Sequence, residues 1–372
     1  MRAARTTRRV VVSAVNFTEG GPLTVLRDCL RAAAATLPDE WEIVALVHDV
    51  ALVIEPRVRL VPFPHAKGSW VKRLSLEWRG FEQNFREEPV DLWLSLHDVT
   101  PRVQARRQAV YCHNPAPFYD LPWREARLEP KLWLFNRFYA YLYGAFIRRN
   151  RWVIVQQQWI REAFITRFGN LPVVVAHPDV KLPPADWSGL PVGTANVPCV
   201  LLYPTLPRVF KNVETVMEAM HRLAATGQTG IELRVTISGN ENPYARWLHE
   251  RFRGTPGVRF VGRQTPEQMA KQYREANAVL FPSKLETWGL PISEAKAWRK
   301  PLLVADLPYA HEAVGSHDQV AFLPATDAGA WARSIAALAQ GDWRVAPTEG
   351  MPVPEPYAPS WPALWQLLVK DL

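Results

Sequence analysis

Short apolar runs alternate with amphipathic stretches from the start of the chain. Val10–Val15 is apolar on both faces, as in a strand that is covered on both sides of a sheet. A loop ending in Gly20 and Gly21 follows, and Pro22 then opens a helix, because proline is tolerated where a helix begins. Further elements are predicted as strands at Glu42–Val47, Val58–Val61, Asp91–Leu96, Ala109–His113 and Trp152–Gln156, with helices at Trp70–Glu87 and Lys131–Arg149. This alternation predicts an α/β fold with a parallel sheet.

Residues 181–198 interrupt the pattern with four prolines and two glycines and no periodicity, which predicts a linker. Alternation then restarts with strands at Cys199–Tyr203, Glu232–Ser238, Val258–Val261, Ala278–Phe281 and Leu302–Ala305, and helices at Val213–Ala225, Ala245–Arg253, Glu267–Ala276 and Pro291–Trp298. We therefore expect one α/β domain at residues 1–180 and a second at 199–345. A tail at 346–372 ends in a helix, Pro362–Lys370, whose apolar face is expected to return to the first domain.

Composition narrows the classes of protein that the chain can represent. Its 372 residues suffice for two domains, and 48% apolar residues exclude a disordered chain. Three widely spaced cysteines are typical of a reducing compartment. No apolar run approaches the roughly 20 residues of a spanning helix, so we expect a cytoplasmic protein. The net charge of +8 suits a phosphorylated substrate or an anionic membrane, whereas nucleic acid is not expected because no recognised binding module is present.

The most informative stretch is Phe281–Lys300, FPSKLETWGLPISEAKAWRK, in which a predicted strand leads through a loop into a predicted helix. The first amides of a helix lack partners and attract a phosphate, and Gly289 lets the backbone approach such a ligand. Glu294 lies one turn into the helix, where it can accept hydrogen bonds from hydroxyls. Glu286 lies in the loop and can point at whatever the phosphate carries. Taken alone, the two glutamates also fit a solvated surface.

This stretch resembles the signature of family 4 glycosyltransferases, whose GT-B architecture has two facing Rossmann-like domains with a cleft between them. The resemblance covers nearly the whole chain, and it is closest to bacterial rhamnosyl- and mannosyltransferases of surface-polysaccharide synthesis. It implies that Glu286 contacts the transferred sugar and that Glu294 binds the ribose. The backbone at Gly289 and Leu290 would then hold the diphosphate.

A second motif, YPTLPRVFKN, follows the first strand of the second half. Arginine can bind two phosphate oxygens at once and lysine adds a point charge, so both suit a diphosphate. In the family an Arg/Lys pair here stabilises the leaving nucleoside diphosphate, which implies this role for Arg208 and Lys211. Arg208 departs from the commonest spacing of the pair. Solvent-exposed basic side chains are the open alternative.

The resemblance implies further site residues at strand ends. Gly20 and Gly21 resemble the glycine loop of the family, and His113 corresponds to the histidine that faces the transferred sugar, with His97 as a second choice. The base pocket is implied for three residues of the second half: Gly239, Val261 and Gly262.

The sequence lacks the Asp-x-Asp of metal-dependent sugar transferases, and it also lacks G-x-G-x-x-G, Walker and G-x-S-x-G motifs. We therefore expect no cofactor and no metal. The resemblance implies a retaining hexosyltransferase. The resemblance favours dTDP-rhamnose or GDP-mannose as donor and a lipid-linked or cell-surface glycan, such as O-antigen, as acceptor. A catalytically silent GT-B binding protein and a sugar-nucleotide epimerase remain as alternatives.

Residues 131–152 are rich in aromatic side chains and have a basic end, and arginines such as Arg102, Arg107 and Arg127 lie nearby in sequence. Such a stretch suits peripheral binding to the anionic inner face of the cytoplasmic membrane. A helix that packs in the first domain, with its arginines in solvent, is the open alternative.

Overall fold

The computed structural model describes residues 7–85, 89–179 and 198–372, and the chain divides into two compact units. The first unit contains the chain up to Phe118, together with Asn136–Asp179 and Val353–Leu372. The second contains Tyr119–Phe135 and the chain from the linker to Pro352. All of the expected linker except Pro198 lies outside the described residues.

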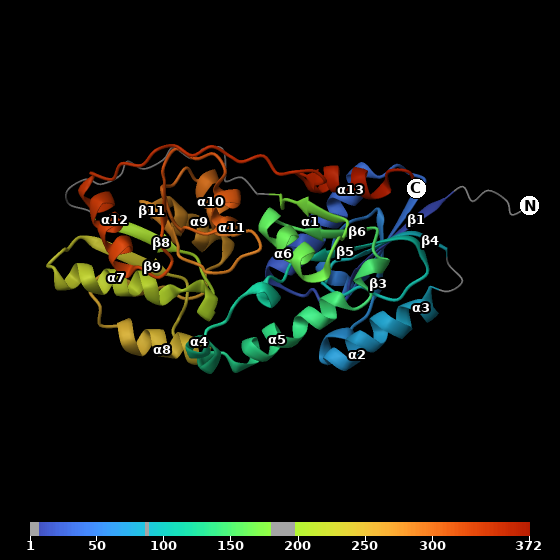
Figure 1. The fold of residues 1–372 in the computed structure, drawn as a ribbon, viewed down its shortest axis with the longest axis horizontal. Coiled ribbons are helices and arrows are strands. Elements are labelled where there is room, and N and C mark those ends of the chain that lie inside the picture. Colours follow the sequence, from blue (N-terminus) through green and yellow to red (C-terminus); the bar gives the residue numbers. More distant parts are fainter. Residues whose placement is uncertain (1–6, 86–88, 180–197) are drawn as a thin grey trace, which may run out of the picture. The chain divides into compact units, whose positions relative to one another are not determined.

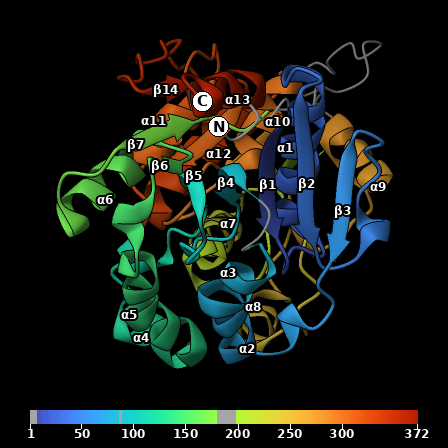
Figure 2. The ribbon, with the colours of Figure 1, turned by 90° about the vertical axis from the view of Figure 1, so that its right-hand side faces the viewer.

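The first unit is built on a parallel sheet in the order β14-β7-β6-β5-β4-β1-β2-β3 (Figure 2). The strands are β1 (Arg8–Ala14), β2 (Trp41–Val47), β3 (Val58–Pro62), β4 (Val90–Ser95), β5 (Ala105–Cys112), β6 (Trp152–Val155), β7 (Val173–Ala176) and β14 (Tyr357–Ala358). The helices of this part are α1 (Gly20–Thr36), α2 (Trp70–Ser75), α3 (Phe81–Asn84), α5 (Pro130–Gly144), α6 (Gln158–Phe168) and α13 (Trp361–Val369). Helix α5 begins in the residues assigned to the second unit.

The second unit is built on a parallel sheet in the order β10-β9-β8-β11-β12-β13. Figure 1 labels its strands β8, β9 and β11. Its strands are β8 (Cys199–Tyr203), β9 (Ile231–Val235), β10 (Val258–Phe260), β11 (Ala278–Phe281), β12 (Leu302–Ala305) and β13 (Val320–Leu323). Its helices are α4 (Trp123–Leu128), α7 (Val213–Ala225), α8 (Pro243–Phe252), α9 (Pro266–Glu275), α10 (Leu290–Ala297), α11 (Pro308–Val314) and α12 (Ala328–Gln340). The central strands β8 and β11 are fully buried, as expected for a sheet covered on both faces.

The structure differs from the expectations at several points, and three of them concern the helices and the domain boundary. Helix α1 begins at Gly20, two residues before Pro22, and the left-handed φ of +64° at this first position favours glycine there. The expected helix Trp70–Glu87 is divided by a π-helical turn, Leu76–Gly80, which turns the Glu77 carboxyl into the interior. Residues 119–135 were expected in the first domain, but they pack with the second unit, to which Glu125 and Glu129 form ion pairs.

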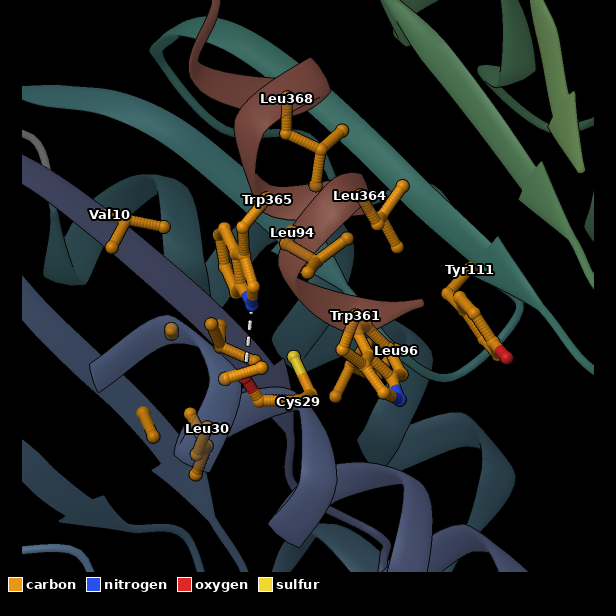
Figure 3. Packing of buried hydrophobic residues seen from close by; sticks show 14 of the residues in the cluster. Val10, Cys29, Leu30, Leu94, Leu96, Tyr111, Trp361, Leu364, Trp365 and Leu368 are labelled. Atoms are coloured by element: carbon orange, nitrogen blue, oxygen red, sulfur yellow. Dashed lines mark hydrogen bonds between the residues drawn. The ribbon is translucent and has the colours of Figure 1, made fainter. Parts of the chain in front are cut away.

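The carboxyl-terminal helix α13 completes the core of the first unit. Ser360 caps it by accepting a hydrogen bond from the Ala363 amide, as the sequence indicates. Its inward side chains pack against α1 and the sheet, and the Trp365 indole donates a 3.0 Å hydrogen bond to the Cys29 carbonyl (Figure 3). The helix is therefore a structural part of the first unit.

Replacing Trp365 by alanine should lower the free energy of unfolding by about 3–5 kcal/mol, because a fully buried indole is lost and a cavity remains. Urea denaturation followed by circular dichroism measures this change. Gln366→Ala, at an exposed position of the same helix, is the matched control and should change stability by less than about 0.5 kcal/mol. Equal effects of the two substitutions would contradict the packing role of α13.

Candidate active site

The carboxyl edge of the second sheet carries the residues that the sequence singles out. Loops after β8, β9 and β11 meet there, because the carboxyl ends of parallel strands lie at one edge. The Lys284 amide donates a 2.7 Å hydrogen bond to the Phe210 carbonyl, which joins the β11 loop to the β8 loop. The Thr205 amide likewise donates to the Thr236 hydroxyl at 2.7 Å, which joins the β8 and β9 loops.

Asn212 fixes the turn between β8 and α7. Its backbone is left-handed, with φ +56° and ψ +40°, a conformation that asparagine tolerates better than most residues. Its buried side-chain amide donates to the Pro282 carbonyl at 2.9 Å and to the Ala325 carbonyl at 2.7 Å. Asn212 therefore ties the β8 loop to the chain after β11 and after β13. In the sequence this residue stood out only as the neighbour of Lys211.

Lys211 and Glu286 form the central ion pair of this edge. The Lys211 Nζ lies 2.5 Å from Glu286 Oε1, and the two side chains are only 17% and 12% exposed. The same ammonium group lies 5.6 Å from the centroid of the Phe281 ring. Limited solvent access strengthens such a pair relative to one on the surface. The structure thus brings together two residues that are 75 positions apart in the sequence.

Gly289 directly precedes α10 and lies against the same phenylalanine ring. Its φ is +86°, and a Cβ at this position would lie 3.1 Å from Phe281 and 3.2 Å from Ile292. Both the backbone conformation and the crowding require glycine here. The Leu290 amide begins α10, whereas Pro291 has no N–H and the Ile292 amide donates to the Gly289 carbonyl at 2.8 Å. An amide at a helix amino terminus is suited to an anion.

Glu294 lies in the second turn of α10. Its Oε2 accepts a 2.5 Å hydrogen bond from the Tyr273 hydroxyl of α9. Burial raises the pKa of the Glu294 carboxyl, while the Tyr273 hydrogen bond opposes this shift. The carboxyl group is therefore held in one orientation by a neighbouring helix. Tyr273 is a site neighbour that sequence reasoning did not identify.

Gly239 and Gly262 also lie close together at this edge. The Gly262 amide donates to the Ile237 carbonyl at 3.1 Å, directly after the bond from the Val261 amide to Val235. Both glycines have positive φ, and a Cβ on Gly239 would lie 2.7 Å from His249. The three residues implied for a base pocket thus come from adjoining loops.

Arg208 directly precedes the turn that carries Lys211, and its Nε lies 2.8 Å from Glu129 Oε1. The guanidinium carbon also lies 5.6 Å from the centroid of the Phe210 ring. Glu129 comes from the segment between β5 and β6, so no motif in the sequence pointed to it.

The first-unit candidates lie at the carboxyl edge of the other sheet. The Phe17 ring contacts the His113 ring at 5.4 Å between centroids, which links the loop that leads to Gly20 and Gly21 with the end of β5. The His113 amide donates to Asp98 Oδ1 at 2.8 Å. His113 Nδ1 is buried and has no hydrogen-bond partner among the described residues.

His97, the second choice for the histidine that faces the sugar, is buried in the interior of the first unit. Its ring is 1% exposed and bonds to the Ser13 hydroxyl and to Arg73, each at 3.0 Å. Burial, followed by the Arg73 charge, lowers its pKa. Glu77 completes this group, and burial raises the pKa of its carboxyl to about 7. His97 thus belongs to a buried polar network with Arg73 of α2 and Glu77 of the π-helical turn.

Comparisons with known proteins bear on the family and the fold of the chain. Residues 195–345 match the model of the family described as "Glycosyl transferases group 1". Comparison with curated proteins gives no match. Among solved structures, a sucrose-phosphate synthase from Thermosynechococcus elongatus is similar with a TM-score of 0.63, at 17% identity over 90% of this chain and 91% of that one.

Two further structures are similar over most of the chain. WaaG, a glycosyltransferase involved in lipopolysaccharide biosynthesis, gives a TM-score of 0.58 at 14% identity, covering 98% and 96% of the two chains. The structure of Anabaena HepE in complex with UDP and glucose gives a TM-score of 0.55 at 14% identity, covering 88% of this chain and 89% of that one. The chain has an α/β GT-B fold, and the family match supports glycosyl transfer.

Gly289→Ala should lower stability by about 1–3 kcal/mol, because a Cβ would add both left-handed strain and a clash with Phe281. Thermal denaturation and nucleoside diphosphate binding measure the effect. Gly341→Ala is the matched control, since Gly341 has φ +78° but a Cβ added there would meet no atom within 4 Å. If Gly289→Ala lowers the free energy of unfolding no more than Gly341→Ala does, crowding around Gly289 is excluded.

Proposed function

We propose that the protein is a retaining glycosyltransferase that moves a hexose or deoxyhexose from a nucleotide sugar to a glycan hydroxyl. The observation that carries the proposal is the pairing of Lys211 with Glu286 at 2.5 Å, against the ring that also contacts Gly289. A cation and a helix amino terminus beside one ring suit a diphosphate, and a carboxylate beside them suits a sugar.

In the proposed reaction the bond between the anomeric carbon and the diphosphate oxygen breaks. Lys211 and Arg208 stabilise the negative charge that develops on the diphosphate, and Glu286 stabilises the positive charge on the sugar ring. The acceptor hydroxyl attacks from the face that the diphosphate leaves, and its proton passes to the departing phosphate oxygen. The product then keeps the anomeric configuration of the donor, and no metal ion takes part.

The finer assignments rest on the sequence resemblance. It favours dTDP-rhamnose or GDP-mannose as donor, and a lipid-linked or cell-surface glycan as acceptor. On the same basis, His113 faces the transferred sugar, and Gly20 and Gly21 approach the donor or acceptor. HepE was solved with UDP and glucose, which supports a nucleotide-sugar donor for this fold.

A panel of UDP, GDP, dTDP and ADP should identify the nucleotide by thermal shift. At 100 times its Kd the cognate diphosphate stabilises the folded state by about 2.7 kcal/mol. Glu294→Ala should weaken its binding about 10-fold or more, since a carboxylate hydrogen bond to the ribose is lost. Glu250→Ala, at an exposed position of α8, is the control and should bind normally.

Turnover in the same samples tests the reaction itself. The anomeric NMR signals of product and donor should show the same configuration, and EDTA should leave the rate unchanged. Binding without transfer to any glycan acceptor would favour a silent binding protein, and conversion of the donor without an acceptor would favour an epimerase. Unchanged nucleotide binding by Glu294→Ala would remove the ribose contact.

We further propose that helix α5 docks on an anionic membrane. No helix among the described residues has the length and apolarity that crossing a bilayer requires. Helix α5 instead has apolar side chains on every side. Its inward residues include Leu132, Tyr139 and Tyr143, while Trp133, Leu134, Phe138 and Tyr141 are between 48% and 73% exposed.

The charges near this surface favour anionic lipid. Lys131 and Arg137 are exposed on the same helix, and Arg124 and Arg127 are exposed on α4. The two glutamates at α4 are used in ion pairs, Glu125 with Lys284 and Glu129 with Arg208. Arg107, expected near this surface, is instead bonded to the Asp371 carbonyl at 2.8 Å. Exposed aromatic and basic side chains together are typical of interfacial helices.

Binding to sedimented vesicles tests this docking. The protein should bind vesicles with 30% phosphatidylglycerol and should not bind pure phosphatidylcholine vesicles. The double variant Phe138→Ser/Tyr141→Ser should lose most of this binding, because two exposed apolar side chains no longer insert. Ile54→Ser/Met351→Ser, which removes two exposed apolar residues elsewhere, is the matched control. Equal binding by both double variants would contradict the role of α5.

A further inference from the structure

The segment Tyr119–Phe135 supplies two carboxylates to the edge of the second sheet. In the sequence it lies between β5 and β6 of the first sheet, but it packs with the second unit. Glu125 lies within its helix α4, and Glu129 follows that helix directly. The two side chains are 12% and 10% exposed, so both carboxylates are largely withdrawn from water.

Each carboxylate binds a different cation. Glu125 Oε1 lies 2.9 Å from the Lys284 Nζ, and its Oε2 accepts a 2.7 Å hydrogen bond from the Tyr119 hydroxyl. Glu129 lies against Arg208, with its Oε1 at 2.8 Å and its Oε2 at 3.2 Å from the Nε. One pair thus attaches the segment through Lys284, and the other holds the arginine of the proposed donor site.

The contact with Glu129 leaves the other end of the guanidinium group available. Both short distances involve Nε, and the terminal nitrogens of Arg208 have no hydrogen-bond partner in the part of the chain that the structure describes. The Phe210 ring supports the group from another direction, and the Arg208 side chain is still 42% exposed. The two terminal nitrogens are the ones that can bind two phosphate oxygens at once.

We infer that Glu129 is a positioning residue, which holds Arg208 by its Nε so that both terminal nitrogens face the donor diphosphate. An arginine side chain on its own samples many rotamers, and fixing it before the donor binds reduces the ordering that catalysis requires. Lys211 has a corresponding partner in Glu286. The inference rests on the proposed function, because it assigns Arg208 a diphosphate ligand.

Glu129→Ala tests the inference in the full chain. The probes are UDP, GDP, dTDP and ADP for binding, and nucleoside diphosphate release from the donor that the wild type turns over. We expect kcat to fall 10- to 100-fold with a smaller change in KM, because the Arg208 contact matters most as charge develops on the leaving group. Glu129→Gln keeps an oxygen that accepts from Nε and should retain most of the activity.

Glu125→Ala is the matched control. It removes a carboxylate of similar exposure from the same segment and releases Lys284, but it leaves Glu129 and Arg208 paired. We expect it to keep kcat within about 2-fold. A further test places Glu129→Ala in the Arg208→Ala background, where it should cause no additional loss because the group that it positions is absent.

Three results would overturn the inference. They are an equal loss of kcat in Glu125→Ala, a loss in Glu129→Gln as large as in Glu129→Ala, and a full additional loss in the Arg208→Ala background. Each would assign Glu129 to attachment of the segment or to folding. Failure of the proposed function gives a different pattern, in which the wild type itself neither binds a nucleoside diphosphate nor releases one. Thermal denaturation of every variant identifies any that do not fold.

Discussion

The side-chain amide of Asn212 holds together the edge of the second sheet on which the candidate site is built. It donates to carbonyls that follow β11 and β13 while its own backbone makes the left-handed turn into α7. Because these bonds are buried, removing the donor would break both of them, and the Ala325 carbonyl would keep only its 3.2 Å side-chain bond from the Thr215 hydroxyl. The positions of Lys211, Lys284 and Glu286 all follow from this turn and from the loops that it joins.

The charges at this edge are arranged in pairs, which explains how a site for an anion can be stable when it is empty. Lys211, Lys284 and Arg208 would repel one another if they stood alone. Each has a carboxylate within 3 Å, and these are Glu286, Glu125 and Glu129. A ligand with two phosphates can bind the donor groups of Lys211 and Arg208 that these carboxylates leave available, so the site is organised before the ligand arrives.

The fold could largely be predicted from the sequence, whereas the site could be predicted only in part. Strands Cys199–Tyr203 and Ala278–Phe281 are confirmed at both ends, since each is a short buried run bounded by polar or proline residues. Strand β7 was missed because its apolar run is short and follows a proline. The edge strand β14 was missed because its two residues lie in a proline-rich tail.

Residues that act through distant partners could not be found from the sequence. The resemblance to a family motif identified Glu286 and Glu294, because their spacing around one helix start alone also fits a solvated surface. It could not identify Glu129, which is 79 positions from Arg208, or Tyr273, which is 21 positions from Glu294. Nothing in a pattern of apolar and polar residues specifies such pairs, since tertiary contacts alone create them. The metal independence and the donor base stay predictions.

The place of α13 has a consequence for the order in which the protein acquires its structure during synthesis. The hydrogen bond from Trp365 to Cys29 joins residues that are 336 positions apart, and the second unit lies almost entirely between them. The ribosome therefore completes the second unit before it releases the helix that closes the first core. Until then, apolar surface on α1 and its sheet stays uncovered, which makes the nascent first unit a natural client for chaperones.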